Sequence, residues 1–112
     1  MSGKEPVDQA DTKLGRLISE LRAFKKRNQI EKMYLFGSMA SGSAPEFSDV
    51  DLLVVSSRFT GKGLLDRSPS LYLSWNLDYP VDFLCYSPEE FDQRRNQITI
   101  VKEAVEHGIE IS

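Results

Sequence analysis

The stretch YLFGSMASGSAPEFSDVDLLVV, Tyr34 to Val55, holds two apolar runs separated by a segment with two glycines, four serines and two closely spaced aspartates. Short apolar runs bounded by turn residues are typical of strands. Residues 50–55 (VDLLVV) are too densely apolar for a surface strand, and residues 32–36 (KMYLF) predict a second, short strand. The two acidic residues at the mouth of a buried strand, Asp49 and Asp51, therefore need a chemical explanation.

Alternation along the strand predicts that Asp49 and Asp51 project to one face, because side chains at positions i and i+2 point the same way. A third acid, Asp82, stands in the apolar run VDFLCY at residues 81–86. If the two strands pair, three carboxylates converge, and they repel one another unless a cation lies between them. Oxygen ligands suit hard divalent cations, and magnesium is held by a few carboxylates together with nucleotide phosphates.

The glycine and serine segment predicts a place for those phosphates. Gly37 and Ser38 directly follow the first strand, and residues 38–41 (SMAS) have the composition of a helix's first turn with Ser38 as its cap. The free N–H groups of such a turn bind anions. Gly37 lets the backbone approach a phosphate because it has no Cβ, and the Ser38 hydroxyl is a donor.

The rest of the chain predicts an α/β (α+β) domain with a mixed β-sheet and helices packed mainly on one face. Apolar residues recur at helical spacing from Asp11 to Asn28, and that segment ends with cations. Pro69 after a capping Ser68 starts a helix through residues 70–77, and Ser87-Pro88-Glu89-Glu90 is a capping box that starts another. A further helix with Ile98, Val101, Ala104 and Val105 on one side precedes a terminal strand at residues 109–111.

Length and composition limit the classes of protein to consider. With 112 residues, we expect a single domain over residues 1–112, with residues 1–7 as a frayed lead-in. Neither a secretory leader nor a membrane-spanning run is found, so the expected compartment is the cytoplasm. The net charge of −3 does not favour direct binding to nucleic acid.

Several other residues have two interpretations. Tyr72 and Trp75 could stack on a base, but their helical spacing favours the core. Cys85 lies in an apolar strand, which favours an inert thiol over a catalytic one. His107 precedes Gly108, which favours a cation at a helix end over a proton shuttle.

The combination GSMASG, five residues, then SDVDL at residues 37–52 resembles the signature of the minimal nucleotidyltransferase family, within the DNA polymerase β-like superfamily. The resemblance implies a nucleotidyltransferase fold in which Gly37, Ser38 and Ser48 face the nucleotide phosphates. It also implies that Asp49, Asp51 and Asp82 are the catalytic residues and hold two Mg²⁺ ions. The family's motif has an arginine where this chain has Ser41, and Lys62 and Arg67 are candidates to replace it.

The resemblance further implies transfer of a nucleoside monophosphate, AMP from ATP, to a hydroxyl group. Stand-alone domains of this kind resemble antitoxins whose partner is a HEPN-type toxin, and a tyrosine of that toxin is the AMP acceptor. The alternative is a catalytically inactive module that keeps the fold and neutralises a partner by docking. The three carboxylates favour the enzyme, whereas Ser41 favours the inactive module.

Overall fold

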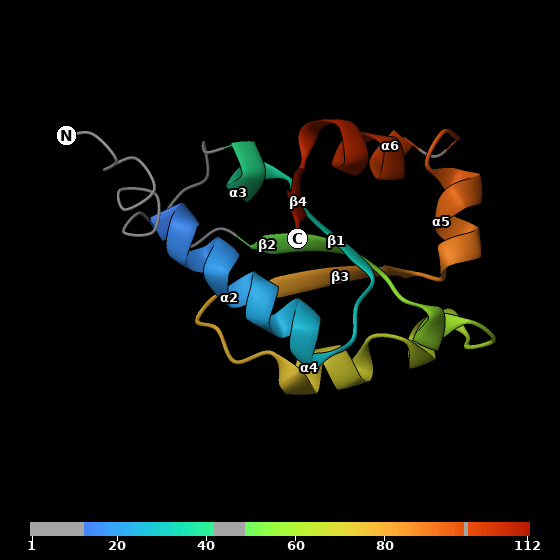
Figure 1. Ribbon diagram of the computed structural model, residues 1–112, viewed down its shortest axis with the longest axis horizontal. Coiled ribbons are helices and arrows are strands. Elements are labelled where there is room, and N and C mark those ends of the chain that lie inside the picture. Colours follow the sequence, from blue (N-terminus) through green and yellow to red (C-terminus); the bar gives the residue numbers. More distant parts are fainter. Residues whose placement is uncertain (1–12, 42–48, 98) are drawn as a thin grey trace.

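The computed structural model describes residues 13–41, 49–97 and 99–112 of the chain. Figure 1 shows a four-stranded sheet with helices around it. The strands are β1 (Lys32–Phe36), β2 (Val50–Val55), β3 (Val81–Tyr86) and β4 (Ile109–Ile111). The helices are α2 (Lys13–Arg27), α3 (Ser38–Ser41), α4 (Pro69–Ser74), α5 (Pro88–Arg94) and α6 (Thr99–His107), with short 3₁₀ turns η1 (Ser57–Phe59) and η2 (Leu64–Asp66).

The sheet is mixed, as the sequence predicts. Its strand order is β3-β2-β1-β4, with β1 antiparallel to both β2 and β4, and β2 parallel to β3. All four strands coincide with the predicted residue ranges. The predicted lead-in at residues 1–7 lies outside the described residues.

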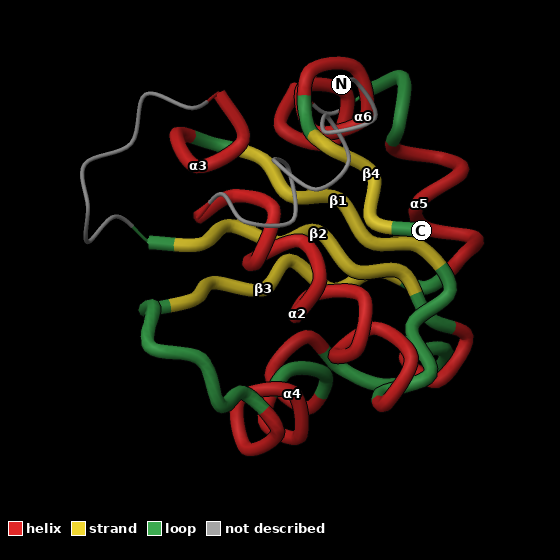
Figure 2. Tube along the Cα trace, turned by 60° about the vertical axis from the view of Figure 1, so that its left-hand side comes forward, coloured by secondary structure: helices red, strands yellow, loops and turns green. Residues whose placement is uncertain are grey.

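Helices cover both faces of the sheet, so the expectation of helices mainly on one face is wrong. Figure 2 shows α2 and α4 together on one side of the strands, and α5 and α6 away from them. Alternate residues of β2 join two separate cores: Val50, Leu52 and Val54 pack with residues of α2 and α4. Leu53 and Val55 pack instead with residues of α5 and α6. A strand buried on both faces shows no polar alternation that could have revealed the second helical layer.

The core under α2 and α4 is built on aromatic rings. Phe83 of β3 stacks on Phe24 with ring centroids 5.7 Å apart, and it meets Tyr72 and Trp75 edge to face at 4.9 and 5.9 Å. The Trp75 indole N–H donates to the Tyr79 carbonyl at 2.8 Å. The core interpretation is therefore confirmed for Trp75, which packs against the buried cluster, whereas Tyr72 touches Phe83 with its ring but is 44% exposed.

Local helix signals are confirmed to different degrees. Ser87 and Glu90 form the predicted capping box: the Ser87 hydroxyl accepts from the Glu90 N–H, and the Glu90 carboxylate accepts from the Ser87 N–H. Ser68 precedes α4 without a side-chain capping bond, and α4 ends at Ser74, before the predicted residue 77. No helix in the described part of the chain is long and apolar enough to cross a membrane.

Candidate functional site

Two of the three predicted carboxylates lie side by side on neighbouring strands. Asp51 of β2 is the register partner of Asp82 of β3, so their Cα atoms are about 4.8 Å apart, the spacing of paired strands. By alternation both side chains lie on the α5 and α6 face, opposite to Val50 and Phe83. Asp82 is exposed and Asp51 is half-buried, so the described helices leave this end of the face open.

The third predicted carboxylate, Asp49, acts on Asp51 through its negative charge. Asp49 lies in the segment just before β2 and is exposed. Burial, together with the negative charges of Asp82 and Asp49, raises the pKa of the Asp51 carboxyl above its ordinary value. The negative charges of Asp49 and Asp82 therefore both act on the Asp51 carboxyl.

The turn after β1 is packed directly against Asp51. Phe36, the last residue of β1, pairs with Asp51 across the antiparallel ladder. Gly37 follows with φ of +80°, a left-handed conformation that favours glycine. A Cβ atom at Gly37 would lie 2.5 Å from Asp51 Oδ2, so the carboxylate occupies the space that any other residue would fill. The sequence predicts that Gly37 lets a phosphate approach the backbone. Its second role, making room for the Asp51 carboxylate, has only one signal in the sequence, a glycine between a strand and a short helix.

The predicted short helix after Gly37 is present, with one difference at its start. Helix α3 begins at Ser38, and the Ala40 N–H donates to the Gly37 carbonyl at 3.1 Å. Gly37 therefore holds the cap position that the sequence assigned to Ser38. Ser41 is the last residue of α3, and Ser48, also predicted to bind the nucleotide, lies outside the described residues.

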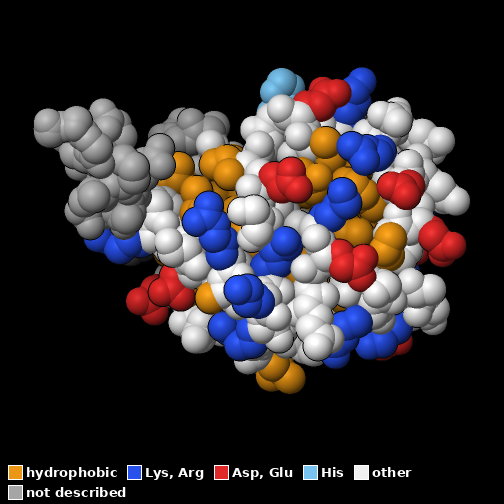
Figure 3. All heavy atoms as spheres, viewed as in Figure 1, with side chains coloured by type: hydrophobic (Ala, Val, Ile, Leu, Met, Phe, Trp, Pro, Cys, Tyr) orange, Lys and Arg blue, Asp and Glu red, His pale blue; other side chains and the backbone are white. Residues whose placement is uncertain are grey.

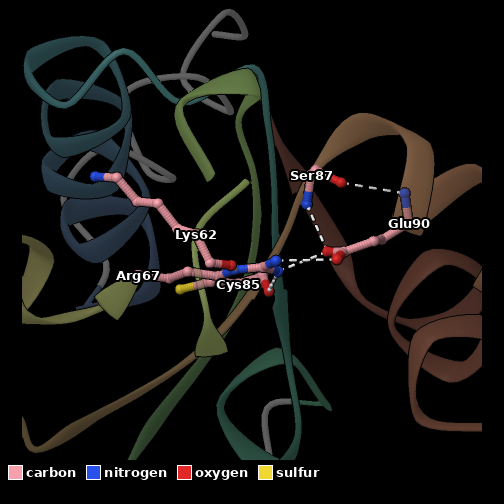
Figure 4. Close-up of polar contacts among 5 residues, drawn as sticks. All are labelled: Lys62, Arg67, Cys85, Ser87 and Glu90. Atoms are coloured by element: carbon pink, nitrogen blue, oxygen red, sulfur yellow. Dashed lines mark hydrogen bonds and ion pairs between the residues drawn. The ribbon is translucent and has the colours of Figure 1, made fainter. Parts of the chain in front are cut away.

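Arg67 does not replace the motif arginine, because it is already bound elsewhere. Figure 4 shows its guanidinium meeting the carboxylate of Glu90, with Nη1–Oε1 and Nη2–Oε2 distances of 2.6 and 2.9 Å. It also donates to the carbonyls of Cys85 and Lys62, at 3.2 and 2.9 Å. Cys85 follows Asp82 by three strand residues, about 10 Å along β3.

Lys62 lies at the same end of β3 as Arg67, since its carbonyl accepts from the Arg67 side chain. Its own side chain extends away from the Arg67–Glu90 pair in Figure 4. Cys85, beside this pair, is a free thiol whose pKa is raised to about 11 by burial, so it stays protonated at neutral pH. The inert interpretation of this cysteine agrees with that environment.

The donor set suits a hard cation. Asp49, Asp51 and Asp82 offer only carboxylate oxygens, and a divalent cation would offset the repulsion that raises the pKa of Asp51. Within residues 13–41, 49–97 and 99–112, no three acidic, histidine or cysteine side chains stand close enough together to hold a metal ion as they are placed. The suitability of these residues for a divalent cation therefore rests on their carboxylate oxygens and on the pairing of Asp51 with Asp82.

The fold is a mixed α+β domain with aspartates beside a glycine turn, and comparison with known proteins identifies its family. The model of the nucleotidyltransferase domain family matches residues 18–107 of the chain. The chain belongs to this family.

One solved structure supports the fold. A crystal structure of a candidate nucleotidyltransferase from Sulfolobus solfataricus is similar to this chain, with a TM-score of 0.57 and 22% sequence identity. The alignment covers 71% of this chain and 75% of that one. Among curated protein sequences, none matches the chain.

Proposed function

We propose that this chain is a magnesium-dependent nucleotidyltransferase that moves AMP from ATP to a hydroxyl group of a partner protein. The observation that carries the proposal is the register of Asp51 with Asp82, beside the Gly37 turn and at the open end of one face of the sheet. Family membership supports transferase chemistry in general. The choice of ATP follows from the resemblance of residues 37–52 to minimal nucleotidyltransferases.

In the proposed reaction, an acceptor hydroxyl oxygen bonds to the α-phosphorus of ATP while the bond from that phosphorus to the bridging oxygen breaks. Pyrophosphate leaves and AMP stays on the acceptor. Asp49, Asp51 and Asp82 would hold two Mg²⁺ ions, which when bound neutralise charge on the attacking and leaving oxygens. Asp82, the exposed member of the pair, accepts the proton that the acceptor hydroxyl gives up.

The Gly37 turn serves the same reaction in two ways. Its missing Cβ leaves room for the Asp51 carboxylate, and its left-handed backbone leads the chain into the first turn of α3, where we propose that a phosphate binds. We propose that Ser38 and Ser48 donate their hydroxyl groups to the phosphate oxygens.

For the acceptor, we propose a tyrosine of a HEPN-type toxin, so that the chain acts as the antitoxin in the cytoplasm. The support is the resemblance of the motif to stand-alone domains that act in this way. A bulky, charged AMP group on that tyrosine would block the active site of the toxin.

A second function is favoured by one specific observation, the serine at position 41. The motif's arginine is a planar, permanently charged phosphate ligand, and Ser41 cannot take its place. Arg67 is engaged with Glu90, so it does not compensate. In this alternative the chain is an inactive module that neutralises the partner by docking.

One assay separates the two functions. The chain is incubated with Mg²⁺, a HEPN-type toxin, and each of the four α-labelled nucleoside triphosphates. We expect label from ATP on the toxin, and a loss of at least a thousandfold with Asp51→Asn, which keeps the size but removes the charge. Asp92→Asn, an exposed aspartate of α5, is the matched control and keeps full activity.

Neutralisation of the toxin is measured in the same mixtures. An enzyme loses neutralisation together with labelling in Asp51→Asn. A toxin that is neutralised equally well by Asp51→Asn, with no label attached, would establish the docking module and reject the transferase.

A further inference from the structure

The outer side of η2 and α4 carries most of the exposed large apolar side chains among the described residues. Leu64 and Leu65 of η2 are 71% and 89% exposed, and Leu73 of α4 is 89% exposed. Tyr72 is 44% exposed although its ring edge contacts Phe83. Among the described residues only one other large apolar side chain, Ile100, is exposed. A concentration of this kind marks an interaction surface.

A hollow continues this surface toward the edge of the sheet. It has a volume of about 270 Å³ and is lined by Leu64, Ser68, Phe83, Cys85 and Arg94, among others. β3 is an edge strand, so the hollow lies along the outer side of the sheet. Leu64 and Ser68 line it directly, and Tyr72 lies next to it through its contact with Phe83, which is also in the lining. We call Leu64, Ser68 and Tyr72 together with Leu65 and Leu73 the η2–α4 surface.

Both ends of the η2–α4 surface carry a guanidinium group. At the Leu64 end, Arg94 lines the hollow and lies over the Tyr86 ring at 5.7 Å. At the Leu73 end, Arg27 donates to the hydroxyl and the carbonyl of Ser74, both at 3.3 Å. In Figure 3, hydrophobic atoms protrude at the lower edge, where Figure 1 places α4, among Lys and Arg side chains. Asp66 is the one acidic residue in residues 62–77.

This charge pattern argues against a second copy of the chain as the occupant. In a two-fold contact the same surface meets itself, so Arg27 and Arg94 of one copy would face arginines of the other. Like charges brought together at an interface cost several kcal/mol. Addition of a partner strand to β3 is also disfavoured, because Arg67 already occupies the outward Cys85 carbonyl.

We propose that the η2–α4 surface binds an amphipathic helix of a partner protein, with leucine-like side chains on its apolar face and acidic residues on its flanks. The apolar face would lie over Leu65 and Leu73 and place one side chain in the hollow beside Leu64. The acidic flanks would meet Arg27 and Arg94. This inference goes beyond the proposed transferase, because it concerns the outer side of η2 and α4, which carries none of the three aspartates, and needs no catalysis.

The test uses two designed helical peptides with the same leucine face, one with glutamates on the flanks and one with lysines. Binding is measured by fluorescence anisotropy without nucleotide or metal ion, so failure here leaves the transferase proposal standing. We expect the glutamate peptide to bind at least tenfold more tightly than the lysine peptide, with an affinity that falls as salt rises. Equal affinities, or no binding of either peptide, would overturn the proposal.

Variants then locate the binding site. Leu65→Ser and Leu73→Ser remove exposed side chains, so folding is preserved, and each should weaken binding of the glutamate peptide at least tenfold. Ile100→Ser, at an exposed apolar residue on α6, is the matched control and should leave binding unchanged. A dimer in ultracentrifugation that Leu73→Ser dissociates, or binding to phosphatidylserine vesicles that both serine variants abolish, would reject the acidic helix in favour of a second copy or a membrane.

Discussion

Two groups of charged residues lie near the two ends of β3, and they differ in how their charges are paired. Near Cys85, Arg67 and Glu90 have opposite charges and face each other in a two-bonded ion pair. Near the start of the strand, Asp51 and Asp82 have the same charge and stand side by side. The charges of the first cluster, the complete cluster, neutralise each other within the protein. The second cluster has no neutralising cation among the described residues, and we call it the incomplete cluster.

The pKa values show this difference directly. Hydrogen bonds from Arg67 and from the Ser87 N–H lower the pKa of Glu90 from 4.5 to about 2. Burial and the neighbouring carboxylates shift the pKa of Asp51 the other way. A lowered acid pKa stabilises the folded state at neutral pH, and a raised one destabilises it. Stability therefore explains the Arg67–Glu90 pair, whereas the aspartates lower stability and are explained only by the proposed function.

The largest effect on stability is expected from breaking the complete cluster. Arg67 is 6% exposed, and Arg67→Met removes the partner of Glu90 and the donors to two carbonyls. Loss of one member of such a pair should lower the free energy of unfolding by about 3 kcal/mol, the low end for buried pairs because Glu90 is 29% exposed. Urea denaturation measures the change, with Arg22→Met, an exposed arginine of α2, as the control. An equal loss of unfolding free energy in the two variants would show that the Arg67–Glu90 pair does not stabilise the fold.

The next effect tests the contact that positions the incomplete cluster. Gly37→Ala places a Cβ at φ of +80° and 2.5 Å from Asp51 Oδ2, which should cost about 2 kcal/mol of stability and displace the carboxylate. Gly61→Ala is a matched control, because Gly61 has φ of +83° and nothing within 4 Å of the added Cβ. Thermal unfolding of both variants separates the backbone strain, which they share, from the contact with Asp51. Identical melting temperatures would mean that Asp51 moves aside at no cost.

The sequence predicts the strands because they depend on local patterns, and it predicts that Asp51 and Asp82 converge only if their two strands pair. Alternation places Asp51 opposite to Val50, and the register of β2 with β3 then brings Asp82 beside it. The capping box at Ser87 was predicted for the same reason, since its partners are three residues apart.

What the sequence could not predict depends on pairs that are distant in the chain. Arg67 and Glu90 are separated by 23 residues, so Arg67 was available as a phosphate ligand until the structure showed its partner. The second helical layer was missed because β2 is apolar at every position except Asp51, and such a strand does not show how its two faces are covered.

Binding of a cation and a nucleotide should recover the stability that repulsion between the carboxylates of the incomplete cluster costs. A ligand at about ten times its Kd raises the free energy of unfolding by about 1.4 kcal/mol through mass action. We expect Mg²⁺ and ATP together to raise the melting temperature of the wild type, more than ATP alone, and to leave Asp51→Asn unchanged. Differential scanning fluorimetry at millimolar concentrations of both is sufficient. A shift of equal size in Asp51→Asn would place the nucleotide away from the aspartates.

The smallest expected effect compares the two clusters in a single pH titration. The pKa of Asp51 is raised above 3.8, so its ionised form costs stability at neutral pH, and that cost disappears as pH falls below the folded pKa. Asp51→Asn should therefore stabilise the ligand-free protein by up to about 1 kcal/mol at pH 7 and by less toward pH 4. Glu90 behaves oppositely, because its stabilising contribution is complete above pH 4.5 and is lost between pH 4.5 and about 2. Urea midpoints for the wild type, Asp51→Asn and the control Asp92→Asn across this range measure both trends. An Asp51→Asn protein that is less stable than the wild type at pH 7 would mean that the Asp51 carboxylate has a stabilising partner, and that the two ends of β3 are more alike than their charges indicate.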